Sequence, residues 1–161
     1  MRPRADPNRT LEKFRAYTQS WTRPAAEPDA GSFRVWQTDA GPPSHSIPPH
    51  LTAKAAAAIS REAFHHIHDA LLHAYFAENR DITDAETLKA IWLQAGLPLA
   101  GFERVTDRAL VDDIIAQHNE AVELGITGVP AVRMEGRDGF VIGAQPMDMY
   151  RRWVARALSK L

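Results

Sequence analysis

Only one part of this 161-residue chain has the residues of a β-hairpin, and it lies near the C-terminus. The apolar segments "PAVRM" (130–134) and "GFVIG" (139–143) flank the turn "EGRDG", which predicts two antiparallel strands. Two strands alone are marginally stable, and apolar strands require neighbours and covered faces. No upstream segment supplies an obvious central strand. The sequence therefore predicts a small, incomplete sheet in a helical chain.

Most of the remaining sequence has helical periodicity. Thr10 is expected to cap a helix that Pro24 ends, and "TDAE" predicts a capping box with Thr83 as N-cap and Glu86 at N3. The short alternation in "FRVWQ" (33–37) favours an isolated strand, and the Pro-rich stretch 38–49 a connector that is neither helix nor sheet. Further helices are expected at 50–60, 61–77, 107–124 and from Pro146 onward.

Composition excludes several classes of function. The net charge of −1 gives no reason to expect nucleic acid as a partner. The absence of cysteine removes disulfides, thiolate metal sites and cysteine nucleophiles. No apolar run approaches the ~18 residues of a membrane helix, and "MRPRADPNRT" lacks the apolar core of a signal peptide. We expect a soluble, cytoplasmic protein that does not bind membranes.

Several sequence blocks nevertheless resemble one redox family. The order helix–"GITGVP"–strand–turn–strand–"GAQP"–helix resembles the C-terminal half of DsbA-like thioredoxin-fold proteins, in particular the FrnE-like branch of predicted dithiol-disulfide isomerases. Upstream, "SHSIPPHLTAKAAA" and "AYFAENRDI" resemble the helical insertion of that family. The likeness extends over about residues 44–158, and the blocks together are far more specific than Gly-Val-Pro alone.

The resemblance implies an α/β, helix-rich fold in two regions. Residues 1–105 correspond to the inserted all-helical domain, with the linker at 38–49, and residues 106–161 to the C-terminal half of a thioredoxin-like domain. In the family, a strand–helix–strand (βαβ) unit precedes the insertion and carries Cys-x-x-C, but here the N-terminal βαβ unit is absent. We therefore expect Met1 to be a mis-assigned or truncated start, with the missing unit encoded upstream in frame.

The resemblance also implies a binding site at the loop Thr127, Gly128, Val129 and Pro130. X-Pro bonds are cis in only ~5% of cases, but the family has a cis-proline here, opposite its dithiol. A cis bond leaves the backbone of Val129 facing outward, where an extended protein or peptide substrate can add strand-like hydrogen bonds.

Other candidate sites are weaker. His65, Asp69 and His73 share one helical face at metal-ligand spacing, but they also fit a solvated face and lack a third strong ligand. His68 and His118 are interpreted as partly buried and hydrogen-bonded. The remaining candidates are interpreted as linker or surface residues, with no catalytic role: Ser44, His45, Ser46, Asp112, Asp113, Glu120, Glu123, Arg151 and Arg152. No metal and no cofactor are expected.

Three functions remain open. The family function is thiol–disulfide oxidoreductase or isomerase, but this chain lacks the required thiolate and is expected to be redox-inactive as it stands. One alternative is a peptide-binding module without redox activity. The other is a relative of glutathione-dependent isomerases and kappa-class transferases. A homodimer is a further possibility, because an unpaired apolar strand edge has to be covered.

Overall fold

A computed structural model describes residues 10–28, 30–136 and 139–159. The fold is rich in helices and has one small sheet among the described residues. The elements are α1 (Leu11–Thr18), the 3-10 helix η1 (Gln19–Trp21), α2 (Thr22–Ala25), α3 (Ile47–Ala57), α4 (Arg61–Phe76), α5 (Ala85–Gln94), α6 (Leu99–Phe102), the 3-10 helix η2 (Glu103–Thr106), α7 (Arg108–Glu123), β1 (Ala131–Val132), β2 (Val141–Ile142) and α8 (Met147–Leu158).

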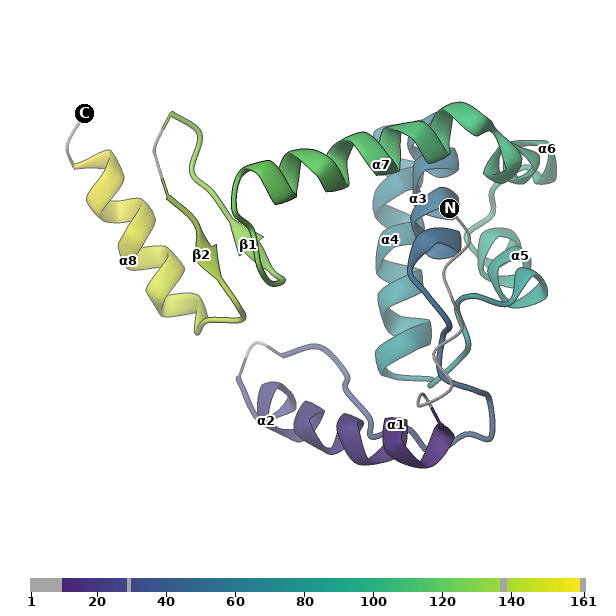
Figure 1. Ribbon diagram of the computed structural model, residues 1–161, viewed down its shortest axis with the longest axis horizontal. Coiled ribbons are helices and arrows are strands. Elements are labelled where there is room, and N and C mark those ends of the chain that lie inside the picture. The colour runs from purple at the N-terminus through teal and green to yellow at the C-terminus, as the bar shows by residue number, and fades with distance from the viewer. Residues whose placement is uncertain (1–9, 29, 137–138, 160–161) are drawn as a thin grey trace.

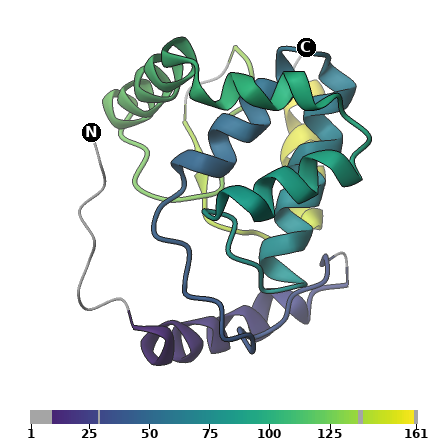
Figure 2. The same ribbon diagram turned by 90° about the vertical axis from the view of Figure 1, so that its right-hand side faces the viewer.

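The elements fall into a helical part and a hairpin part that α7 connects. Helices α3 to α6 gather around one another, and α1 and α2 lie across one end of them in both views (Figures 1 and 2). Helix α7 starts beside α3 and runs out to the hairpin, which has α8 alongside it (Figure 1). No helix within the described ranges combines the length and apolarity needed to cross a membrane.

The main core lies between α3, α4 and α5. Ala55 and Ala56 of α3 are fully buried, and their small side chains let α4 approach closely. Ser60 caps α4, because its side chain accepts a hydrogen bond from the Ala63 N–H at 3.0 Å. Trp92 of α5 is also fully buried and donates its indole N–H to the Pro98 carbonyl. Burial of these apolar surfaces is the main stabilising term of the helical part.

A second, aromatic core joins α1 and η1 to the end of α4. Its buried members are Phe14, Trp21 and Trp36. The Trp21 ring lies 4.9 Å from that of Phe76, and Phe14 lies 5.1 Å from Trp36, both in edge-to-face orientations. Thr10 caps α1 as expected, accepting from the Lys13 N–H at 3.3 Å.

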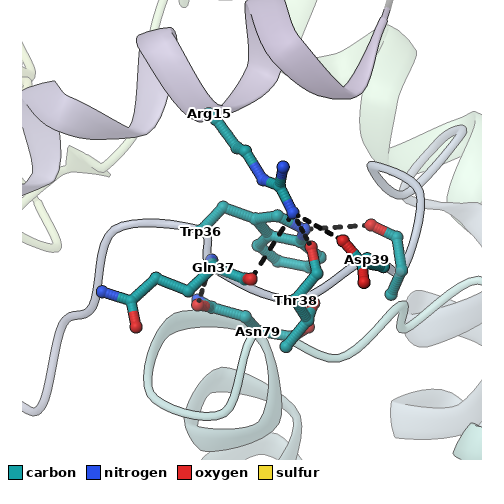
Figure 3. Close-up of polar contacts among 7 residues, drawn as sticks. Arg15, Trp36, Gln37, Thr38, Asp39 and Asn79 are labelled. Atoms are coloured by element: carbon teal, nitrogen blue, oxygen red, sulfur yellow. Dashed lines mark hydrogen bonds and ion pairs between the residues drawn. The ribbon is translucent and has the colours of Figure 1, made fainter.

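The predicted strand at 33–37 is wrong. The segment is irregular, and its backbone bonds to groups in the helical part (Figure 3). Trp36 N–H donates to Thr18 Oγ1 at 3.0 Å, and Gln37 N–H donates to Asn79 Oδ1 at 3.0 Å. Arg15 on α1 closes the other side by donating to the Thr38 carbonyl at 2.8 Å. Side chains and helix ends thus satisfy backbone groups that a neighbouring strand would otherwise satisfy.

Three predicted boundaries also move. The N-cap of α5 is Asp84 and not Thr83, because the Asp84 carboxylate accepts from Thr87 N–H at 2.8 Å while the Thr83 hydroxyl donates to Asp81. The connector predicted at 38–49 ends at residue 46, since α3 begins with prolines in its first turn, where no backbone donor is needed. Pro24 lies inside α2, which ends one residue later.

The predicted hairpin is confirmed, with shorter strands. β1 and β2 pair antiparallel, with Ala131 opposite Ile142 and Val132 opposite Val141. Unlike the helical part, this region has almost no core: beyond Trp92, only Ala157 is buried among the described residues. Helix α7 buries no residue at all. The apolar side chains of the hairpin and α8 are therefore partly buried or exposed, and Ala157 is the one that is buried among those described.

Candidate functional site

The loop between α7 and β1 presents its backbone outward. Gly125, with a φ of 72°, ends α7, and the Val129–Pro130 peptide bond is cis, the conformation that the resemblance implies. The Val129 side chain is 89% exposed. The Pro130 carbonyl accepts a hydrogen bond from Gly143 N–H at 2.8 Å, which fixes the loop against the far end of β2.

Gly128 allows this loop to approach β2 closely. A Cβ atom at this position would lie 3.2 Å from Cγ2 of Ile142, which is tighter than ordinary van der Waals contact. The absence of a side chain at Gly128 thus brings the loop onto the hairpin. Together with the Gly143–Pro130 hydrogen bond, this contact sets the direction in which the chain enters β1.

An apolar groove lies between β1 and α8. Its volume is about 510 Å³. Pro130, Val132 and Met134 line one wall, and they are alternate residues, as expected for one face of an extended segment. The opposite wall comes from α8 and includes Tyr150, Trp153 and Val154. The cis-proline loop therefore leads directly into a groove with methionine and aromatic side chains, the lining typical of small-molecule and peptide sites.

The groove has the chemistry of a binding site. Its lining contains no thiol, imidazole or carboxylate, and Arg133 is its one charged side chain. Among the described strands, β1 pairs only with β2, so its second edge has no strand partner within the described residues. The arrangement can bind a strand-like segment through backbone hydrogen bonds and apolar contacts.

The histidine candidates do not assemble into a site. His65, Asp69 and His73 are all exposed on α4, and the described residues contain no group of three or more His, Cys, Asp or Glu that could hold a metal. The interpretation of His68 and His118 as partly buried is wrong, since both are exposed. His68 stacks on Phe64 across one helical turn, and His118 lies on the solvent-exposed surface of α7.

The other polar candidates also lie outside the groove lining. Ser44 Oγ lies 2.7 Å from Nδ1 of His45 in an exposed pair. Asp112 pairs with Arg108, Asp113 pairs with Lys54, and Glu120 and Glu123 are exposed on α7. Arg151 forms an ion pair with Asp148 on α8.

Sequence reasoning identified the loop but not the opposite wall of the groove. The α8 residues were assigned only to a helix, and Arg133 only to a strand. The available signal was the strongly one-sided apolar pattern of α8, which indicates a face that has to pack on something.

A family model matches a part of the chain that includes the loop and the groove. The model for the DSBA-like thioredoxin domain matches residues 49–155, which is more than half of the chain. The chain belongs to the DSBA-like thioredoxin family. This family membership confirms the resemblance described above, and the helix-rich thioredoxin-like fold with it.

Solved structures show the same fold. DsbM, a cytosolic disulfide reductase from Pseudomonas aeruginosa, is 20% identical with a TM-score of 0.68, over 92% of this chain and 78% of DsbM. DsbM with GSH is 21% identical with a TM-score of 0.59, over 74% and 61%. A protein assigned as a disulfide isomerase from Nitrosomonas europaea is 19% identical with a TM-score of 0.62, over 71% and 58%. This DSBA-like chain thus matches little more than half of the Nitrosomonas protein. A search of curated proteins found no match.

Proposed function

We propose that this DSBA-like chain binds an extended segment of a protein substrate in the groove between β1 and α8, as the substrate-binding part of a thiol–disulfide oxidoreductase or isomerase. One observation carries the proposal: the exposed loop Thr127–Pro130 opens directly into the apolar groove. In this proposal, residues 106–161 form the part of the thioredoxin-like domain that holds the substrate, and residues 1–105 form the helical insertion.

The physical basis is strand addition. The second edge of β1 carries backbone groups that can pair with an extended substrate, and alternate substrate side chains then point toward α8. Burial of apolar side chains between Val132 and Trp153 supplies the affinity, at ~25 cal/mol per Å² of apolar surface removed from water. The groove thereby selects unfolded segments, because folded proteins seldom present extended apolar chain.

The thiols of the exchange reaction have to come from outside these 161 residues, since the sequence contains no cysteine. We expect the isolated chain not to reduce insulin disulfides. We also expect glutathione to reduce insulin at the same rate with and without the chain. A rate above the glutathione control in a turbidity assay, after removal of contaminating redox enzymes, contradicts this. A cytosolic relative, DsbM, is consistent with a cytoplasmic location for this chain as well.

Binding itself is tested with one matched pair of variants. Val154 lines the groove and is 45% exposed, so V154E places a charge in the binding site without burying it in a core. Val122 on α7 is 59% exposed and lies outside the groove lining, which makes V122E the control. With a labelled peptide of alternating valine and glutamine, we expect V154E to weaken binding about tenfold or more and V122E to leave it unchanged. Equal binding by both variants contradicts the proposed site.

A further inference from the structure

We propose that the groove prefers extended segments in which acidic residues alternate with apolar ones, because Arg133 lines the groove and can form an ion pair with a substrate carboxylate. This inference rests on the proposed function and goes one step further by naming the substrate class. The occupant is a strand-forming peptide that presents apolar side chains to α8 and a carboxylate to Arg133.

Arg133 lines the groove and has no carboxylate partner among the described residues. Its Cζ atom lies 5.7 Å from the centroid of the Phe140 ring, a cation–π contact between the strand segments that follow β1 and precede β2. The side chain is exposed, and no described carboxylate forms an ion pair with it. Several other described arginines, among them Arg152 and Arg156 of α8, also have no ion pair with a described carboxylate, but Arg133 is the one arginine in the groove lining. Within the described residues, Arg133 is therefore a cation that Phe140 positions at the groove and that no carboxylate neutralises.

The charges of the chain point to the same class of partner. Residues 125–161 contain six Lys or Arg and three Asp or Glu, whereas residues 1–124 contain 13 and 17. The region that carries the groove is thus basic, although the whole protein has a net charge of −1. A basic surface attracts acidic segments and disfavours basic ones.

The alternation follows from strand geometry. Pro130, Val132 and Met134 face the groove, and Arg133 lies between two of them in sequence. A peptide that adds to the edge of β1 places side chains opposite these residues in the same alternation. Positions opposite Val132 receive apolar side chains, and the position opposite Arg133 favours Glu or Asp, because opposite charges across a strand pair are stabilising.

The test compares two synthetic peptides that differ only in charge: alternating valine and glutamate, and alternating valine and glutamine. By fluorescence anisotropy at low salt, we expect the glutamate peptide to bind the wild-type protein about three- to fivefold more tightly, the range of an exposed ion pair. R133Q should remove this preference and R133K should retain it. R152Q removes an equal charge from the surface of α8, outside the groove lining, and should leave the preference intact. About 0.5 M salt should abolish it.

Each other outcome overturns the proposal in a recognisable way. Equal binding of both peptides contradicts the acidic preference but leaves the proposed function standing. A preference that R152Q removes as fully as R133Q shows a general charge effect instead of recognition by Arg133. If neither peptide binds, both the inference and the proposed function fail, and a dimer in light scattering then makes a second copy the alternative occupant of the groove.

Discussion

Asn79 holds the extended segment 33–38 against the helical part. It is 3% exposed and, with a φ of 55°, is the one described non-glycine residue with a positive φ. Its side chain accepts from Gln37 N–H (Figure 3). The same side chain donates to the Arg34 carbonyl, while the Asn79 carbonyl accepts from the Thr38 hydroxyl at 2.7 Å. Asparagine suits this position because it tolerates the left-handed region and its amide supplies both a donor and an acceptor.

Replacing Asn79 should therefore be costly. N79A removes two part-buried hydrogen bonds, those to Gln37 N–H and the Arg34 carbonyl, and places alanine, which has no side-chain hydrogen bond, in the left-handed region. We expect the free energy of unfolding to fall by about 2–3 kcal/mol in urea titrations. The control is N119A on the exposed surface of α7, with an expected change within about 0.5 kcal/mol. Equal effects of the two variants contradict the role assigned to Asn79.

His50 makes stability depend on pH. Burial of part of its imidazole lowers its pKa below 6.5, and the nearby charges of Lys54 and His68 lower it further. Because the unfolded chain then binds this proton more readily than the folded one, stability is lost as pH falls through 6.5 toward the lower folded pKa.

H50Q should flatten this dependence. As the pH falls below about 6, we expect the melting temperature of H50Q to fall less than that of the wild type. H66Q, at an exposed position on α4, serves as the control and should keep the wild-type slope. Parallel curves for the wild type and H50Q show that His50 does not contribute to the slope.

At the residue scale, the sequence correctly predicted that a side chain caps the start of α5, but it did not predict which of two neighbouring residues does so. Thr83 and Asp84 are both good N-cap residues, and Thr83 alone completes a capping box with Glu86. The hydroxyl of Thr83 instead bonds Asp81 at 2.6 Å, which leaves Asp84 to cap α5. The loop Thr127–Pro130 was found through a family resemblance, whereas Arg133 requires the three-dimensional arrangement of the groove to be noticed.

Helices α5 and α6 meet at a glycine that leaves no room for a side chain. A Cβ atom on Gly101 would lie 2.8 Å from Cδ1 of Ile59 and 3.0 Å from Cζ2 of Trp92. Trp92 cannot move freely, because it is fully buried and its indole N–H bonds the Pro98 carbonyl. Gly101 therefore sets how closely α6 packs on α5 and on the end of α3.

We expect G101A to destabilise the protein by about 1–2 kcal/mol through overpacking, as measured by urea titration. G41A is the control, since no atom lies within 4 Å of a Cβ at Gly41. I59A should recover part of the loss in the double variant, because it removes the closer of the two contacts. If I59A does not restore any of the stability lost in G101A, the contact with Trp92 alone accounts for the loss. If G101A is as stable as the wild type, the packing described here is contradicted.

At the element scale, amphipathic periodicity located α4, α5, α7 and α8, because one face of each is more apolar than the other. Helix α3 was located by its alanine content. The strand predicted at 33–37 failed for a physical reason. Its alternation of Phe33 and Val35 is real, but Trp36 packs in the aromatic core, and side chains such as Asn79 satisfy the backbone. Local alternation cannot distinguish a strand from an extended segment held by side-chain hydrogen bonds.

The molecule as a whole is unevenly packed. Both core clusters lie within residues 14–92, whereas the region from α7 to α8 contributes Ala157 as its one buried described residue. Regions with few buried apolar contacts open locally at low free energy. The sequence indicated this imbalance through the shortage of strands around the hairpin, but it did not show that α7 buries none of its apolar residues.

Hydrogen exchange with and without the alternating valine–glutamate peptide tests this picture and the groove most directly. In the free protein, we expect the amides of α4 and α5 to exchange at least about a hundredfold more slowly than those of β1, β2 and α8. Peptide at about 100 times its Kd should slow exchange up to about a hundredfold in β1 and α8, and leave α4 and α5 unchanged. Equal protection of both regions in the free protein, or peptide-induced protection outside the hairpin and α8, contradicts a substrate groove in an open C-terminal region.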